Sequence, residues 1–253
     1  PATARSVKLK DKLDKPPTKT DGVQVWSIND ADRVARGLPE RWRVAVKLGI
    51  QAGLRPGEVF GLSVDDINFL GRELTVRRQV LNVRGRLCFG PPKTKDSFRT
   101  IPITDDLVTA LAQHVERFPP IEVTLPYAEP SGEPVMVRPL FSTRESGAVN
   151  KNYFSAKIWR PALKCAGIPV IRSNGMHVLR HSYASLMLAH GIGVTEVAKY
   201  LGHHDPGFTL RTYTHLMEGS SERTKRAIDA AFLGKSSNDD DPESDEEDHE
   251  APR

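Results

Sequence analysis

The segment HVLRH, residues 177–181, holds two histidines and an arginine whose spacing suits anion chemistry. His177 and Arg180 are three residues apart, so their side chains would share one face of a helix. A guanidinium beside an imidazole adds nothing to stability, but the two groups together can bind a phosphate. His177 and His181 also have the spacing of a helical zinc pair, although Val178 stands where that pattern requires Glu. Zinc is therefore disfavoured, and a pair of solvated helix residues is the alternative.

A second histidine segment, LGHH at residues 201–204, precedes a candidate nucleophile. Gly202 is expected to end a helix and to present His203 at the helix end. Tyr213, in TLRTYTH, follows ten residues after His203 and nine after His204. Because the residue after Gly202 begins the turn, His203 is the preferred functional histidine and His204 is the alternative. Taken alone, a tyrosine such as Tyr213 is more often a half-buried packing residue.

An arginine and a glutamate lie at a predicted junction of two helices, in GLRPGEVFGL, residues 53–62. Pro56 suits the first turn of the second helix. Arg55, just before it, can direct its guanidinium into a cleft. Glu58, three residues further on, can hold Arg55 or a neighbouring histidine in place. A simple salt bridge at a helix start is the alternative.

A lysine follows in PPKTKDSFRTIPI, residues 91–103. Lys93 is predicted at the tip of a hairpin between two strands, where a solvated turn lysine is the alternative. Residues 85–94 are faintly similar to a phosphate-binding P-loop. Pro91 and Pro92 lack the backbone N–H donors on which such a loop depends, so a nucleotide site is disfavoured.

Helices are expected to position most of these residues. A small antiparallel sheet is expected early in the chain, from strands within 67–80, 85–95 and 98–103. The Pro-rich stretch 118–138 is expected to be a surface loop. The predicted fold class is α+β, mainly α-helical, with a small three-stranded antiparallel sheet. Helices are expected from Asn29 or Asp30 to residue 38, and at 40–53, 56–62, 104–118, 150–166, 177–190, 194–202, 207–214 and 221–233.

Charge is distributed unevenly along the chain. The formal net charge is +4, but residues 235–253 hold nine acids and two bases, hence −7, which leaves +11 on residues 1–234. A body this basic indicates a polyanionic partner. We expect a basic linker or arm at 1–28, a folded domain at 29–234 and a disordered acidic tail. Since the chain starts at Pro1, we expect a processed or trimmed chain.

The cysteines and the apolar runs of the sequence argue against a disulfide-stabilised protein and against a membrane-spanning protein. Cys88 and Cys165 are far apart and in no metal-ligand spacing, so a disulfide framework is disfavoured and a reduced, cytoplasmic protein is expected. No apolar run approaches the ~20 residues that a membrane span needs.

Taken in order, these segments resemble the boxes of the tyrosine site-specific recombinase (phage integrase) family, over about residues 29–234. GLRPGEVFGL resembles the first arginine box of the family, and PPKTK resembles its hairpin lysine. HVLRHSYAS resembles the second box, and LGHHDPGFTLRTYTHL resembles the box of the third histidine and the nucleophile. The resemblance implies the catalytic-domain fold of these enzymes.

The resemblance also implies a chemistry. It is DNA strand cleavage and religation through a covalent 3′-phosphotyrosyl intermediate, as in integration or excision of a phage or mobile element. Arginines would bind the non-bridging oxygens, His177 would accept the Tyr213 proton or bond the phosphate, and Lys93 would protonate the leaving 5′-oxygen. No cofactor and no metal are needed. The implied catalytic set is Arg55, Lys93, His177, Arg180, His203 and the nucleophile Tyr213, with Glu58 in support.

The implied partner is double-stranded DNA. A homo-oligomer, a tetramer, would act in the synaptic complex, with a monomer as one option for the free protein. Helix 221–234 would dock onto a neighbouring protomer, or pack in cis, through Ile228, Ala231 and Phe232. The expected location is the cytoplasm of a bacterial host, at the nucleoid and not at a membrane. Three alternatives stay open: a type IB topoisomerase-like enzyme, a non-cleaving DNA-binding module of this fold, and a metal-dependent phosphodiesterase.

Overall fold

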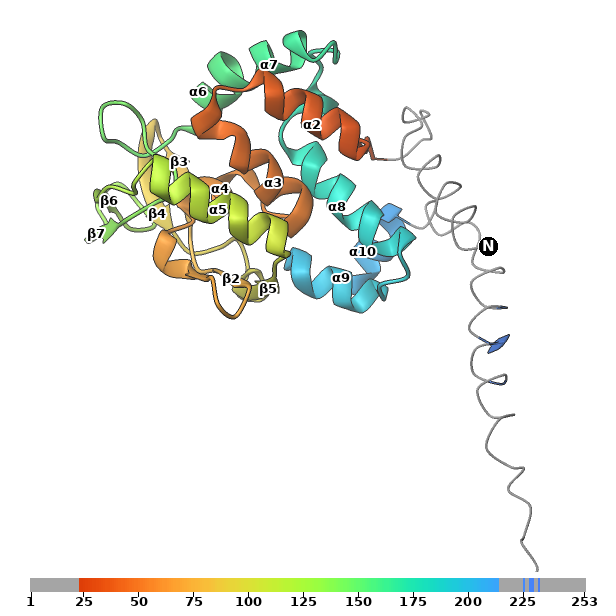
Figure 1. Cartoon of the computed structure of the whole chain (residues 1–253). Coiled ribbons are helices and arrows are strands. Elements are labelled where there is room, and N and C mark those ends of the chain that lie inside the picture. Colours follow the sequence, from red (N-terminus) through yellow and green to blue (C-terminus); the bar gives the residue numbers. More distant parts are fainter. Residues whose placement is uncertain (1–22, 214–224, 226–227, 230–231, 233–253) are drawn as a thin grey trace, which may run out of the picture. The chain divides into compact units, whose positions relative to one another are not determined.

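The computed structural model describes residues 23–213 together with Lys225, Ile228, Asp229 and Phe232 (Figure 1). By its internal contacts the chain divides into two units, Pro1–Leu216 and Met217–Arg253. Residues 23–213 belong to the first unit. The predicted acidic tail and most of the predicted linker and of helix 221–233 lie outside the described residues, so the predicted domain boundaries stay a prediction.

Helices make up about half of the described structure and are its main regular element, as the sequence predicts. Short 3-10 turns precede or join them at Glu40–Trp42, Val64–Asp66, Lys95–Ser97 and Arg172–Asn174. The α-helices are α2 (Ile28–Gly37), α3 (Arg43–Ala52), α4 (Pro56–Gly61), α5 (Asp105–Arg117), α6 (Lys151–Phe154), α7 (Arg160–Cys165), α8 (His177–Ala189), α9 (Val194–Leu201) and α10 (Pro206–Tyr213), and a π-helical turn, Ser155–Trp159, joins α6 to α7.

Helix α3 occupies the centre of the domain and packs against α2, α5 and α8 (Figure 1). Its apolar side chains form much of the core, and Gly49 lets α8 approach closely. A Cβ atom at Gly49 would lie only 2.7 Å from Leu179 Cδ1. This contact fixes α8 against α3, and with it the functional segment that begins α8.

The chain upstream of α2 is also packed into the domain, earlier than the predicted start at Asn29 or Asp30. Trp26 is 7% exposed and stacks on Trp159 with ring centroids 5.8 Å apart. Its indole N–H donates to Asn174 Oδ1 at 3.0 Å, and its backbone N–H donates to Ser182 Oγ at 2.7 Å. Ser27 then caps α2 by accepting from the Asp30 backbone N–H.

The strands form three small antiparallel sheets. A three-stranded sheet orders β1 (Ile67–Asn68), β2 (Glu73–Val76) and β5 (Arg99–Pro102), with Leu74 opposite Ile101. The hairpin of β3 (Gln79–Val83) and β4 (Arg86–Gly90) is a separate two-stranded sheet. A third pair, β6 (Val123–Pro126) and β7 (Pro134–Val137), lies between α5 and α6.

The predicted pairing of the early strands was wrong in detail. The predicted strand 67–80 is split into β1, β2 and β3, because a tight turn at Gly71–Arg72 reverses the chain and Arg78 leaves the sheet to pair with Asp66 at 2.5 Å. The segment 118–138, predicted as a surface loop, holds β6 and β7. Pro126 and Pro134 lie at the ends of these strands, and the other prolines of the segment lie outside them. The first error concerns which strands pair and the second concerns a pair of strands that was not predicted, and the α+β class holds.

Candidate active site

The predicted site residues come from five segments of the domain. Arg55 and Glu58 lie at the start of α4, His177 and Arg180 lie in the first turn of α8, and Lys93 lies between β4 and β5. His203 follows α9 directly, and Tyr213 ends α10.

Glu58 is the anionic centre around which two arginines are arranged. Its side chain is 1% exposed, and Oε1 accepts from Arg55 Nη1 at 2.7 Å and from Arg99 Nη1 at 3.2 Å. Oε2 accepts from Arg99 Nη2 and from the Arg55 backbone N–H, both at 2.9 Å. Burial raises the pKa of Glu58, but the charges of Arg99, Arg180 and Arg55 outweigh it and hold this pKa at about 2. Glu58 is therefore ionised, and it fixes the Arg55 guanidinium.

Arg99 is a site residue that was not predicted from the sequence. It is 7% exposed, and its guanidinium also donates to the carbonyl oxygens of Ser97 and Tyr200, at 2.9 and 2.5 Å. A signal was present in the sequence. Along β5, Arg99 shares a face with the buried Ile101, so alternation alone places this arginine inside.

Arg180 is held by the carboxyl ends of two helices. It is 3% exposed and donates to Gly53 O, after α3, at 2.6 Å and to Leu201 O, in the last turn of α9, at 2.5 Å. Helix carboxyl ends carry partial negative charge, which stabilises a buried cation. Burial and the charge of Arg55 lower the pKa of Arg180 to about 9, so it is still a cation at neutral pH.

Arg55 also donates hydrogen bonds near the carboxyl end of α9. Its Nη2 donates to Gly202 O and its Nη1 to Ser97 Oγ, each at 3.3 Å. Both arginines are thus bound to the carbonyl groups around Leu201 and Gly202 that precede His203.

The two predicted histidines are neutral. Partial desolvation of the otherwise exposed His177, and then the charges of Arg180 and Arg55, lower the pKa of His177 to about 4, and burial with the same two charges lowers that of His203 to about 3. His203 Nδ1 is hydrogen-bonded to Thr209 Oγ1 on α10 at 2.7 Å. His204 instead has an 85% exposed side chain that pairs with Asp96 at 2.7 Å. The geometry therefore favours His203 over His204.

Tyr213 contacts a different histidine from the one expected. Its side chain is buried, 2% exposed, and its Oη lies 2.6 Å from His181 Nδ1. Burial raises the pKa of Tyr213 to about 12, although Arg180 opposes this shift. In the sequence, His181 stands out only as half of a disfavoured zinc pair.

Lys93 is exposed, and the structure does not bring it into contact with the arginines and histidines. The residues that follow it are nevertheless fixed to them, since Thr94 Oγ1 and Ser97 Oγ are 2.9 Å apart and Ser97 Oγ donates to Gly202 O at 3.3 Å. Gly202 permits this close approach. It has φ +65°, and a Cβ atom there would lie 2.8 Å from Ser97 Cα.

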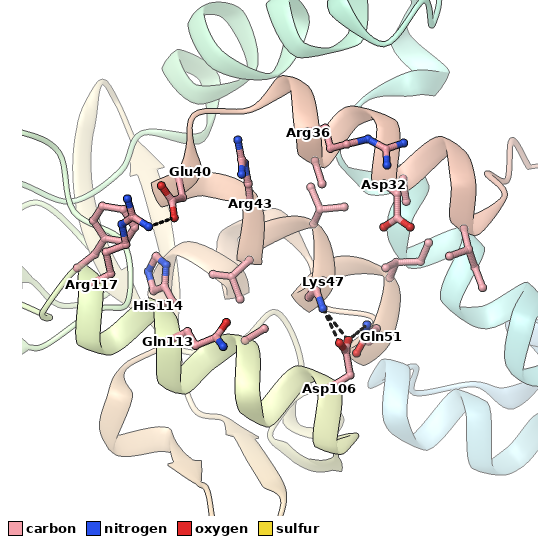
Figure 2. A pocket seen from close by; sticks show the side chains of 18 of the residues that line it. Asp32, Arg36, Glu40, Arg43, Lys47, Gln51, Asp106, Gln113, His114 and Arg117 are labelled. Atoms are coloured by element: carbon pink, nitrogen blue, oxygen red, sulfur yellow. Dashed lines mark hydrogen bonds and ion pairs between the residues drawn. The ribbon is translucent and has the colours of Figure 1, made fainter.

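A groove of about 1010 Å³ lies elsewhere on the domain, between α2, α3 and α5 (Figure 2). Lys47 and Asp106 pair across it at 2.7 Å, and Glu40 and Arg117 pair at 2.5 Å. None of the predicted catalytic residues lines this groove.

No group of three or more His, Cys, Asp or Glu side chains within the described part of the chain is placed to hold a metal ion. Over the same residues, no helix has the length and apolarity needed to cross a membrane.

The domain is mainly helical, and it brings arginines and histidines together, with a tyrosine on its last described helix. This combination is typical of the catalytic domains of tyrosine recombinases. The chain belongs to the phage integrase family, whose model matches residues 20–219. The predicted family and fold class are therefore confirmed.

Relatives of the chain carry recombinase and integrase names. A tyrosine recombinase XerC-like protein of Caldanaerobacter subterraneus subsp. tengcongensis is 26% identical over 83% of this chain and 55% of its own length. Tyrosine recombinase XerA of Pyrococcus furiosus is 30% identical over 90% of this chain and 66% of its own length. The chain spans about half the length of the first curated relatives that it matches.

Two solved structures share the fold. The Tn1549 transposon integrase in complex with circular intermediate DNA matches with a TM-score of 0.67 and 18% identity, over 83% of this chain and 68% of that one. The catalytic domain of bacteriophage HP1 integrase matches with a TM-score of 0.53 and 18% identity, over 83% of this chain and 98% of that one.

Proposed function

We propose that this chain is the DNA-cleaving and rejoining part of a site-specific recombinase, with Tyr213 as the nucleophile. The observation that carries the proposal is the convergence of Arg55 and Arg180 on the helix end just before His203. Such a set of cations suits a phosphodiester that is being displaced, and α10 brings Tyr213 within the electrostatic reach of Arg180.

The arginines supply most of the charge at the transition state. A guanidinium gives two parallel donors to the non-bridging oxygens of a phosphate, which an ammonium cannot do. Glu58 and the helix-end carbonyls fix both guanidinium planes before DNA binds, so little reorganisation remains for the reaction itself.

The histidines and Lys93 complete the proposed mechanism. His177 and His203 are neutral, so each can donate one ring N–H to the phosphate without itself carrying charge. Lys93 lies on an exposed segment beside this cluster and would protonate the leaving 5′-oxygen when DNA is bound. Tyr213 would then be joined to the 3′-phosphate, and the bond energy is kept for religation.

The partners are part of the proposal. Duplex DNA is the proposed substrate, since residues 1–234 carry a charge of +11 and the similar Tn1549 transposon integrase was solved with DNA. We further propose a tetramer on DNA, integration or excision of a phage or mobile element as the biological role, and action at the nucleoid of a bacterial host. The predicted docking helix 221–234 belongs to this proposal. Its Ile228 and Phe232 are exposed, whereas Ala231 lies outside the described residues.

A nicked suicide substrate tests the chemistry. We expect wild-type protein to form an SDS-resistant adduct with DNA in the presence of EDTA, and Tyr213→Phe to bind DNA but form none. Tyr153→Phe is the matched control, because Tyr153 is an exposed tyrosine on α6, and its adduct should equal wild type. An adduct that persists in Tyr213→Phe, or a requirement for divalent metal, would contradict the proposal.

Two further outcomes separate the alternatives. Exchange of strands between two DNA sites distinguishes a recombinase from a type IB topoisomerase-like enzyme, which would only relax supercoils. Binding without any adduct in wild-type protein would instead indicate a non-cleaving module of the same fold.

A further inference from the structure

The hydroxyl group of Tyr213 is placed against one particular imidazole. His181 Nδ1 lies 2.6 Å from Tyr213 Oη, with the two rings tilted by 52° and their centroids 6.0 Å apart. His181 comes directly after Arg180 on α8. The same helical turn therefore directs Arg180 to the helix-end carbonyls and His181 to α10.

His181 is in the protonation state that a proton acceptor requires. Burial, followed by the charges of His177 and Arg180, lowers the pKa of His181 to about 4, so the ring is neutral at neutral pH. In the tautomer that carries its ring proton on Nε2, His181 Nδ1 accepts a hydrogen bond from the Tyr213 hydroxyl, and this is the tautomer that a proton acceptor requires. The titratable and charged groups around His181 are His177 and Arg180 on its own helix, Tyr213 on α10, and His203 after α9.

His177 is less well placed for this role. Its ring meets the ring of His181 edge-on, with centroids 5.0 Å apart, and Tyr213 bonds to His181. His177 can therefore support His181 or bind the phosphate, while the phenol proton has its acceptor in His181.

We propose that His181 is a further catalytic residue of this chain, the base that accepts the Tyr213 proton during attack on the phosphate and returns it during religation. The inference rests on the proposed function, in which Tyr213 is the nucleophile. It replaces the role that the family resemblance implied for His177.

The step balances in atoms and charge. The Tyr213 O–H bond breaks and its proton moves to His181 Nδ1, while Oη forms a bond to phosphorus. The bond from phosphorus to the 5′-oxygen breaks, and that oxygen takes a proton from Lys93. Religation reverses each transfer. Since Tyr213 is only 2% exposed, local movement must first open Oη to the phosphate.

The test uses the intact chain in single-turnover cleavage of the suicide substrate. His181→Ala removes the base, and His181→Asn keeps a hydrogen-bonding amide near the position of Nδ1 but no basic nitrogen. We expect each variant to cleave about 100-fold more slowly or worse, the usual contribution of a general base. His190→Ala is the matched control, because His190 is an exposed histidine at the end of the same helix, and it should stay within about twofold of wild type.

Two readouts separate a chemical role from a structural one. Added imidazole should restore part of the His181→Ala rate, because a free base can then take the Tyr213 proton. A substrate with a 5′-bridging sulfur, whose leaving group needs no acid, should leave the His181 defect in place. The variants should also lose the flat rate profile above pH 6 and gain a rate that rises about tenfold per pH unit, as phenolate forms without a base.

The possible failures are distinguishable. If wild-type protein forms no Tyr213 adduct, the proposed function fails. If wild type forms the adduct and Tyr213→Phe does not, but both His181 variants cleave at the wild-type rate or faster, only the role of His181 is overturned. Faster cleavage would mean that His181 restrains Tyr213. If His181→Ala does not fold, His181→Asn and its pH profile decide the matter.

Discussion

Arg99 and Glu58 form an ion pair that is closed to solvent. Arg99 Nη2 lies 2.9 Å from Glu58 Oε2, and the two side chains are 3% and 1% exposed. Since Glu58 also holds Arg55, the pair connects β5 to the arginine that we expect to bind the phosphate.

Loss of the Glu58 charge should therefore weaken both stability and activity. Glu58→Gln leaves buried cations without their anion, and removal of one partner of such a pair destabilises by about 3–5 kcal/mol. Urea denaturation measures this loss, and DNA cleavage should fall with it because Arg55 is no longer fixed. Asp105→Asn is the control, since Asp105 and Arg72 form a solvent-exposed ion pair. This variant should change the free energy of unfolding by less than about 1 kcal/mol. Equal effects of the two variants would contradict the structure.

The pKa shifts predict two separate ranges of acid destabilisation. The pKa values of His177, His181 and His203 are about 4, 4 and 3, below the ordinary 6.5, so the unfolded chain binds protons first as the pH falls. Stability should therefore decline from pH 6.5 downward. The pKa of Glu58 is instead lowered from 4.5 to about 2, so its contribution is present above pH 4.5 and is lost between there and pH 2.

Single variants separate these ranges. His203→Gln should flatten the decline of the unfolding free energy between pH 6.5 and 3, whereas Glu58→Gln should flatten only the decline below pH 4.5. Urea titrations at half-unit pH steps measure both slopes. A wild-type stability that is constant from pH 7 to 4 would show that the histidines are not held neutral.

Gly202 should tolerate no side chain. Alanine there would have φ +65° and would place its Cβ atom 2.8 Å from Ser97 Cα and 3.0 Å from Asp96 O. The left-handed conformation alone costs about 1–2 kcal/mol, and the backbone clash adds to that. Gly191→Ala is the matched control, because Gly191 has φ +86° but no atom near its Cβ position, so it should show the conformational cost alone. Thermal and urea unfolding compare the two, and equal losses would argue against the close approach at Ser97.

The two adjacent histidines should differ sharply in function. His203→Gln is expected to reduce cleavage by about 100-fold or more, because His203 lies beside both arginines and bonds to α10. His204→Gln should stay within about threefold of wild type, since His204 is exposed and its pair with Asp96 is a surface contact. The reverse order of the two rates on the suicide substrate would make His204 the functional histidine.

Lys93 should be needed only to protonate the leaving 5′-oxygen. Lys93→Ala is expected to cleave an ordinary phosphodiester about 100-fold or more slowly. It should recover most of this loss on a substrate with a 5′-bridging sulfur, which departs without a proton. Arg55→Ala should recover nothing, because its guanidinium acts on the non-bridging oxygens. Recovery in neither variant would mean that Lys93 is not the acid.

The sequence by itself determined the helices, the α+β class and the candidate residues, because these depend on local signals. Periodicity reports which face of an element is buried, and Gly202 and Pro56 mark where helices end and begin. The order of the boxes was enough to predict the family, although no single segment would have been.

Only the tertiary structure decided which residues far apart in the sequence contact one another. Glu58 and Arg99 are 41 residues apart, and His181 and Tyr213 are 32 apart. The pairing of β2 with β5, past the hairpin of β3 and β4, is of the same kind. A burial pattern says that a side chain points inward but not which group it meets there. Which histidine contacts the Tyr213 hydroxyl therefore depends on how α8 and α10 pack, and spacing along the chain does not reveal it.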